Sequence, residues 1–227
     1  MPAPHAMQAL YDSSWHHPGV CWLACLLLAI ALLRGHPPLR AFLTLFTIEI
    51  ALDALFTGGL SPLAPGSTLA VPLSVLFVIL GDLRFFLLLE RCALGEAGAR
   101  PRALARAGGL SLLVPALSLG IGRLAPSLGE GRMVFLVYEL LFTLLTVGLV
   151  WVVLPRRLRA RPEGARRFAE ELARFELVQY ASWAFADLVI LAGIPSVGFA
   201  LRFAPNVMYY ALFLPYVLWR APREGAS

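Results

Sequence analysis

The chain has 227 residues, of which 59% are hydrophobic and only 15% are charged, and its mean hydropathy is +0.75. This composition excludes a disordered chain and argues against a soluble globular domain; it predicts a polytopic helical membrane protein. The formal net charge is +5, and arginine supplies all of the basic residues counted in it, because the chain has no lysine. The arginines lie mostly between apolar runs, which favours a membrane topology signal over a nucleic-acid-binding surface.

Apolar runs long enough to cross a bilayer, which takes about 20 residues each, recur along the chain. A polar tail, residues 1–17, precedes the first of them. We therefore predict an all-α integral membrane protein, a single domain over residues 1–227 with seven transmembrane helices. The predicted spans are residues 19–33, 39–60, 69–89, 103–124 and 133–154, and two runs between 175 and 219 that a turn at 193–196 separates.

The distribution of arginine predicts the orientation of these spans. Arginine is concentrated between spans one and two, three and four, and five and six, and after the seventh. The positive-inside rule assigns these segments to the cytoplasm, so we expect an inner (plasma) membrane protein with its N-terminus outside and its C-terminus inside. The most basic segment, residues 156–174, is also expected to contact anionic lipid headgroups.

Two parts of the chain share a pattern of polar residues and turns. Asp53 and Asp187 are each followed, after the same interval, by a tight turn. In the next span, Asp82 and Asn206 each precede an aromatic pair at the same offset. In the predicted topology both copies begin on the outer side of the membrane. Two copies with the same orientation are related by an axis along the membrane normal, as in some transporters. The sequence thus predicts two parallel three-helix repeats, residues 19–89 and 133–219, and a linker helix, residues 103–124.

Acidic residues inside the predicted spans are the first candidates for function, because ionisable groups are costly in a membrane and usually functional there. Five acids face only two arginines, Arg84 and Arg202, so the surplus acids must be protonated, hydrated or paired with a cation. Such acids suit proton carriers and general acids, although interhelical hydrogen bonding alone remains an alternative. The five acids are Glu49, Asp53, Asp82, Glu139 and Asp187.

A substrate site is expected where these acids meet other polar and aromatic side chains of the spans. Arg84 and Arg202 would balance charge or gate the site. The expected substrate-binding residues are Glu49, Asp53, Asp82, Trp183, Asp187, Arg202, Asn206 and Tyr210.

Several kinds of chemistry are excluded by residues that the spans lack. All four histidines lie in the tail or a loop, so a seven-helix zinc hydrolase with membrane-embedded histidines does not fit. The absence of lysine excludes a retinal Schiff base. The three cysteines match no metal or redox spacing, and no phosphate-binding or nucleophile-elbow motif occurs. We expect no metal, no cofactor and no nucleic acid. The expected partners are membrane lipids and a small-molecule or lipid substrate.

The predicted layout resembles that of the SWEET and PQ-loop transporters. This resemblance implies that polar residues on the third helix of each triplet line a central pocket. Asp82 and Asn206 hold those positions here, with Trp183 on a neighbouring helix as a stacking wall. The first and fifth spans have no Pro-Gln pair, so the resemblance is one of layout. It favours a transporter of a small solute or cation, coupled to protons through the buried carboxylates.

Two other functions fit the same layout. It is also similar to that of small carotenoid (lycopene) cyclases of bacteria and archaea, which protonate a polyene with a membrane-embedded carboxylic acid. The alternative is therefore an intramembrane enzyme acting on a lipid or isoprenoid, with Asp53, Asp82, Glu139 or Asp187 as the proton donor. A third is a seven-helix sensor or receptor that couples to a partner through the arginine-rich segment.

Overall fold

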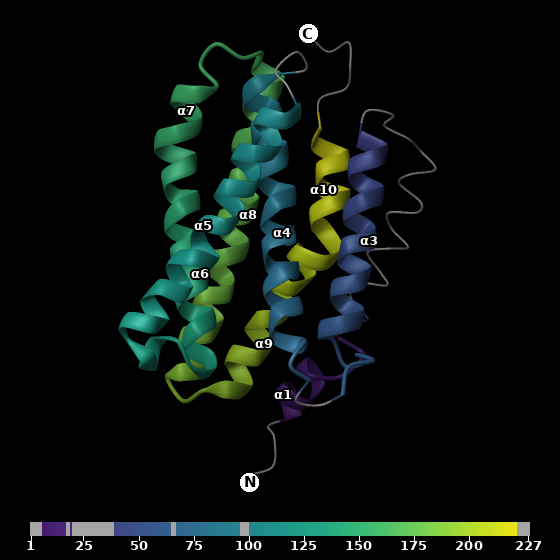
Figure 1. Ribbon diagram of the computed structural model, residues 1–227, viewed down its shortest axis with the longest axis vertical. Helices are drawn as coiled ribbons and strands as arrows, with labels where there is room; N and C mark the ends of the chain where they lie inside the picture. Colours follow the sequence, from purple (N-terminus) through teal and green to yellow (C-terminus); the bar gives the residue numbers. More distant parts are fainter. Residues whose placement is uncertain (1–5, 17–18, 20–38, 65–66, 96–99, 222–227) are drawn as a thin grey trace. The chain divides into compact units, whose positions relative to one another are not determined.

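A computed structural model describes residues 6–16, 19, 39–64, 67–95 and 100–221, and every regular element in these residues is a helix (Figure 1). The prediction of an all-α chain is confirmed for this part. The α-helices are α1 (Ala6–Tyr11), α3 (Arg40–Thr57), α4 (Ala70–Leu94), α5 (Arg100–Leu124), α6 (Gly131–Gly148), α7 (Leu154–Arg157), α8 (Glu163–Leu191), α9 (Pro195–Asn206) and α10 (Phe213–Arg220).

Four of the described helices are long and apolar enough to cross a membrane: Ala70–Leu94, Pro101–Leu124, Gly131–Arg157 and Pro195–Arg220. They correspond to the third, fourth, fifth and seventh predicted spans. α3 and α8 form where the second and sixth spans are predicted, but their charged residues keep them out of this set. The first span, residues 19–33, lies outside the described residues apart from Gly19. The count of seven, the orientation and the repeats stay predictions.

The surface of α5 carries the apolar side chains expected of a lipid-facing helix. Only 22% of its most apolar stretch is buried. Exposed apolar area of this extent is unusual on a soluble monomer and marks contact with a partner or a membrane. The exposed leucines of α5 are Leu104, Leu112, Leu113, Leu117, Leu119 and Leu124.

Two of the long apolar helices contain a π-helical segment. η3 (Leu149–Val153) joins α6 to α7, and η4 (Val207–Leu212) joins α9 to α10. Pro155 follows the first segment and Pro215 follows the second, so each leaves a carbonyl inside its segment, that of Trp151 and that of Ala211, without the usual helical donor four residues on. Proline has no N–H for the helical hydrogen-bond ladder, which accounts for a local change of ladder beside it.

The turn before α9 is built from glycine and proline as the sequence predicts. Gly193 adopts a φ of +86°, a left-handed conformation that suits glycine after the end of a helix. Its N–H donates to the carbonyl of Ile190 at 3.0 Å, and the N–H of Ile194 donates to that of Val189 at 3.2 Å. Pro195 then starts α9, where its missing N–H has no partner to lose.

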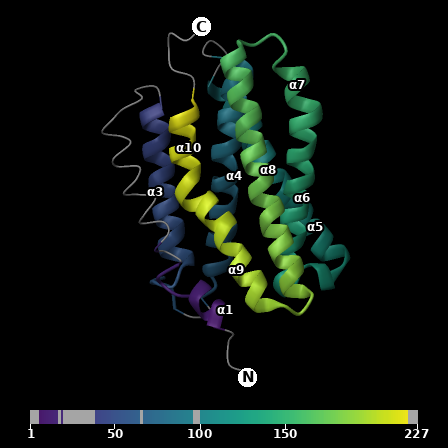
Figure 2. The ribbon, with the colours of Figure 1, turned by 180° about the vertical axis from the view of Figure 1, so that it is seen from behind.

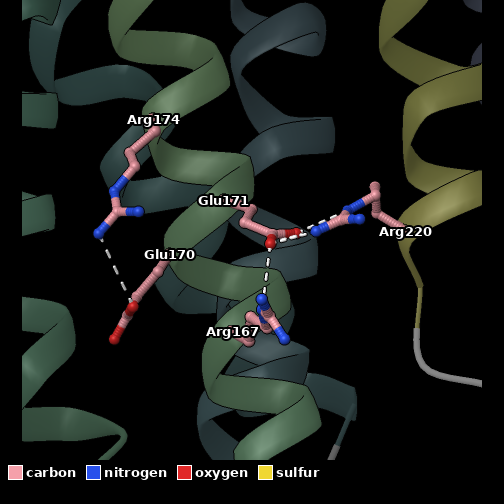
Figure 3. A network of polar contacts seen from close by, with 5 residues as sticks. All are labelled: Arg167, Glu170, Glu171, Arg174 and Arg220. Atoms are coloured by element: carbon pink, nitrogen blue, oxygen red, sulfur yellow. Dashed lines mark hydrogen bonds and ion pairs between the residues drawn. The ribbon is translucent and has the colours of Figure 1, made fainter.

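α8 begins well before the apolar run that predicts it, so much of the arginine-rich segment is helical. Ion pairs at i, i+4 spacing support this extension: Arg167 Nε lies 3.4 Å from Glu171 Oε1, and Arg174 Nη2 lies 4.0 Å from Glu170 Oε2 (Figure 3). Glu171 also accepts a hydrogen bond of 2.7 Å from Arg220 Nε. Opposite charges at this spacing compensate for the low hydropathy of the segment.

The described residues divide into two compact units. Unit 1 comprises Met1–Val78 and Phe185–Trp219, and unit 2 comprises Ile79–Ala184 and Arg220–Ser227. In unit 1, α9 continues through η4 into α10, and α1 lies beside α9 (Figure 2). Each unit has its own apolar core: Leu43, Phe46, Ile50, Phe199 and Phe213 belong to that of unit 1, and Phe85, Phe86, Phe142, Leu158 and Leu172 to that of unit 2.

A buried ion pair joins the C-terminal turn of α4 to α7 within unit 2. Both terminal nitrogens of Arg157 donate hydrogen bonds to Glu90: Nη1 to Oε1 at 2.5 Å and Nη2 to Oε2 at 2.9 Å. The Glu90 side chain is 1% exposed and that of Arg157 33% exposed. Nη1 of a second arginine, Arg106, lies 3.9 Å from Glu90 Oε2, which is a weaker contact. Glu90 therefore depends on Arg157 to compensate its charge.

Arg157→Gln is expected to lower the free energy of unfolding by about 3 kcal/mol, because it leaves a buried carboxylate with one distant arginine. The matched control is Arg174→Gln, which removes an exposed pair worth about 0–1 kcal/mol. Denaturant or thermal unfolding of the purified variants in detergent measures both. Equal losses in the two variants would contradict the role given to the Glu90 pair.

Candidate functional site

Buried polar side chains gather in two clusters, one in each unit. The Asp82 cluster lies in unit 2 and comprises Asp82, Arg84, Tyr138, Glu176, Gln179 and Tyr180. The Asp187 cluster lies in unit 1 and comprises Tyr11, His16, Asp187, Arg202 and Asn206.

Asp82 is held by two tyrosines that come from two other helices. Its side chain is buried in α4, and both carboxylate oxygens accept hydrogen bonds. The hydroxyl of Tyr180 in α8 donates to Oδ1 at 2.6 Å, and the hydroxyl of Tyr138 in α6 donates to Oδ2. The carboxylate thus ties three helices of unit 2 together at one point, and both tyrosine protons are directed at it.

A second acid approaches the same region from α8. Glu176, Gln179, Tyr180 and Trp183 follow one another at i, i+3, i+4 and i+7, so they share one face of the helix. Glu176 and Gln179 are buried, and Gln179 Nε2 donates to Glu176 Oε2 at 3.4 Å. Oε1 of Gln179 is a buried acceptor with no hydrogen-bond donor among the described residues. This face of α8 therefore supplies a carboxylate and an amide to the cluster.

Arg84 supplies the positive charge of the Asp82 cluster. Its side chain is completely buried and interacts electrostatically with both Asp82 and Glu176. Asp82 and Arg84 are two residues apart and cannot share a face of a regular helix. Both are nevertheless buried, because α4 is enclosed around most of its circumference in this stretch. One arginine thus serves two acids.

Aromatic rings surround these polar groups. The ring of Tyr180 stacks on Phe142 with a centroid separation of 3.9 Å, and it meets Trp183 edge to face at 5.3 Å. The ring of Phe142 also lies near those of Phe85 and Phe86 of α4, with centroid separations of 6.3 and 5.9 Å. The predicted wall residue Trp183 therefore stands next to the tyrosine that binds Asp82.

Asp187 of unit 1 forms an ion pair with Arg202 of α9. The Asp187 side chain is completely buried, and Oδ1 accepts a hydrogen bond from Arg202 Nη1. Arg202 Nε donates to the hydroxyl of Tyr11 at 3.0 Å, which also accepts from Asn206 Nδ2 at 3.1 Å. Three of the predicted site residues, Asp187, Arg202 and Asn206, are thus brought together, with α1 added to them.

His16 completes the Asp187 cluster from the segment after α1. Its Nδ1 lies 2.7 Å from the carbonyl oxygen of Tyr11, so Nδ1 carries the proton, and Nε2 accepts from Asn206 Nδ2 at 3.3 Å. Its ring packs against Phe203 at 4.3 Å. Burial lowers the pKa of His16 from 6.5, and the nearby charge of Arg202 adds to this, although the Tyr11 carbonyl and Asp12 oppose it. The neutral imidazole is the form that fits.

The other predicted site residues are buried or half-buried within their own units. Glu49 and Asp53 lie on one buried face of α3 in unit 1, where Asp53 Oδ1 accepts from the Thr57 hydroxyl at 2.9 Å. Tyr210 of η4 meets Tyr209 edge to face at 4.7 Å in the same unit. Glu139 is buried on α6 in unit 2.

Several residues of the two clusters are not among the site residues that the sequence predicts. The i, i+3, i+4, i+7 spacing of polar residues on α8 is a usable signal for Glu176, Gln179 and Tyr180. Tyr138 has no such signal. Neither do Tyr11 and His16, which lie in a polar tail without periodicity.

Among the described residues, no group of three or more His, Cys, Asp or Glu side chains is arranged to hold a metal ion. The two clusters consist instead of carboxylates, arginines, amides and aromatic hydroxyls. Such groups can move protons, bind a polar or charged small molecule, or donate a proton to one.

Comparison of the chain with models of known protein families, with curated proteins and with solved structures finds no match.

Tyr138→Phe and Tyr180→Phe are each expected to lower the free energy of unfolding by about 1–3 kcal/mol, because each removes a hydrogen bond to Asp82. Both effects should shrink when Asp82 is already replaced by Asn, since the interactions share one partner. Double-mutant cycles from unfolding in detergent measure this coupling. Additive effects would show that the tyrosines act independently of Asp82.

The stability that His16 contributes is expected to fall as the pH drops below about 6.5. A pKa lowered by folding means that the unfolded state binds more protons, so the contribution is complete above the ordinary value and is lost on acidification toward the lowered one. His16→Gln removes this titration. The melting temperature of the wild type should therefore fall more than that of His16→Gln between about pH 7.5 and pH 5.5; parallel curves would contradict this.

Proposed function

We propose that this chain is a membrane transporter of a small solute or cation, coupled to protons through the acids of the Asp82 cluster. The observation that carries the proposal is that Asp82 and Glu176, both buried in unit 2, share one buried arginine. Arg84 can balance one negative charge, so the second acid needs a proton or a bound cation. Exchanging one for the other is the elementary step of a proton-coupled transporter.

The hydrogen bonds of Asp82 support the same step. Tyr138 and Tyr180 keep the carboxylate in a fixed position whether or not it carries a proton, because a hydroxyl can both donate and accept. They also come from two other helices, α6 and α8. A change in the charge of Asp82 therefore alters contacts between helices, which is how a proton could drive a change of conformation.

We place the protein in the inner (plasma) membrane, with its N-terminus outside and its C-terminus in the cytoplasm. Four apolar helices support a membrane location. The arginine-rich residues 156–174 favour the cytoplasm for the segment between α6 and the apolar part of α8. Membrane lipids and the transported small molecule are the partners that this proposal requires.

Asp82→Asn is expected to abolish pH-gradient-driven flux, because an amide cannot take up and release a proton in the working pH range. The assay uses the purified chain in liposomes that contain a pH-sensitive dye, with a pH gradient imposed. Glu130→Gln, in an exposed loop position, is the matched acid-to-amide control and should keep the wild-type rate. If Asp82→Asn transports protons as fast as Glu130→Gln, Asp82 is not the coupling group.

An intramembrane enzyme acting on a lipid or isoprenoid is the second candidate. The aromatic rings of Phe142, Tyr180 and Trp183 favour it, because such faces stabilise carbocations formed when a polyene is protonated. Mass spectrometry of lipids from cells with and without the protein separates the two functions. A product made only in expressing cells and lost in Asp82→Asn would support the enzyme; unchanged lipids with proton flux would support transport.

A further inference from the structure

We infer that the Asp82 cluster binds a small organic ammonium ion, with Gln179 accepting a hydrogen bond from its N–H group. The inference rests on the proposed transport function and names the class of substrate. Three observations in unit 2 carry it: the excess of acids over arginine, the acceptor on Gln179, and the aromatic faces beside both.

The charges of the cluster favour a cation. Among the described residues, Arg84 is the arginine that interacts with both Asp82 and Glu176 in this buried site. A ligand with one positive charge would complete the balance that the protein leaves open. An anionic ligand would add a third negative charge to the same buried site, which is strongly unfavourable in a medium of low dielectric constant.

Gln179 indicates that the cation carries N–H donors. Its Nε2 is engaged by Glu176, while Oε1 is completely buried with no donor among the described residues. A buried acceptor without a donor is costly, so a ligand that supplies one gains affinity there. The hydroxyls of Tyr138 and Tyr180 are already directed at Asp82, so the ligand has to bring its own donors.

The aromatic rings favour an organic cation over a metal ion. The ring of Tyr180 is stacked on that of Phe142 and meets that of Trp183 edge to face. Aromatic faces attract ammonium groups and pack well against a short alkyl chain, and tryptophan does so best. A metal ion would instead need several oxygen, nitrogen or sulfur ligands around it, and the described residues offer no group of three His, Cys, Asp or Glu for that purpose.

The test compares four probes of similar size: propylammonium, its N-trimethylated analogue, propanol and propionate. Binding to the purified protein in detergent is measured by calorimetry and by the rise in melting temperature. We expect the wild type to bind both cations and neither propanol nor propionate. Equal binding of propanol or propionate, or no binding of either cation, would overturn the inference.

Gln179→Met, close to glutamine in shape but without the amide, tests the N–H contact. It should weaken propylammonium about tenfold and leave the trimethylated ion within about twofold, because only the first has N–H groups to donate. Equal weakening of both ions would assign Gln179 a structural role and overturn the contact. Glu176→Gln, which keeps the shape of the side chain and removes its charge, should weaken both cations; unchanged binding would overturn the charge argument.

The liposome flux assay keeps this inference separate from the proposed function. Ammonium binding without any pH-driven flux would overturn transport and leave the ligand class standing. Proton flux in a protein that does not distinguish the ammonium ions from propanol would overturn the ligand class and leave transport standing.

Discussion

The scarcity of charge is the constraint on which this structure depends. In an apolar surrounding without water, a buried charged group has to find its partner within the protein, or it is too costly to keep. Glu90 meets this condition with the forked contact from Arg157, and Asp187 meets it with Arg202. Helices are the form in which the backbone satisfies the same condition, since each N–H and carbonyl is bonded within its own segment.

The two polar clusters satisfy this constraint to different degrees. The Asp187 cluster has one buried acid and one buried arginine, so its charges balance, and its histidine and amide are hydrogen-bonded to each other. The Asp82 cluster has two acids for one arginine and a buried amide oxygen to which no described residue donates. A balanced cluster stabilises a structure, whereas an unbalanced one changes its interactions when a proton or cation arrives. This difference is the physical reason for the proposal that Asp82 and its neighbours carry the function.

The sequence alone predicts the helices better than the contacts between them. Long apolar runs locate α4, α5, α6 and α9–α10, because a backbone in an apolar surrounding has to make its hydrogen bonds within its own segment, as a helix does. Asp82, Asp187, Arg202 and Asn206 are predicted as site residues because intramembrane polar groups are rare. The pairing of Asp82 with Tyr138 is not predictable, since the two are far apart in the chain and tyrosine suits core and membrane interface alike. The early start of α8 is missed because ion pairs, which hydropathy does not register, stabilise it.

The π-helical segment η4 gives the Asp187 cluster of unit 1 a particular mechanical setting. Asn206 is the last residue of α9, and the hydrogen-bond ladder changes directly after it, next to Pro205. Helices bend most readily where proline or a π turn interrupts the regular ladder. α9 carries Arg202 and Asn206, which hold Tyr11 and, through Asn206, His16. A bend at η4 would therefore move Arg202 and Asn206 relative to α10, and with them their contacts to Asp187, Tyr11 and His16.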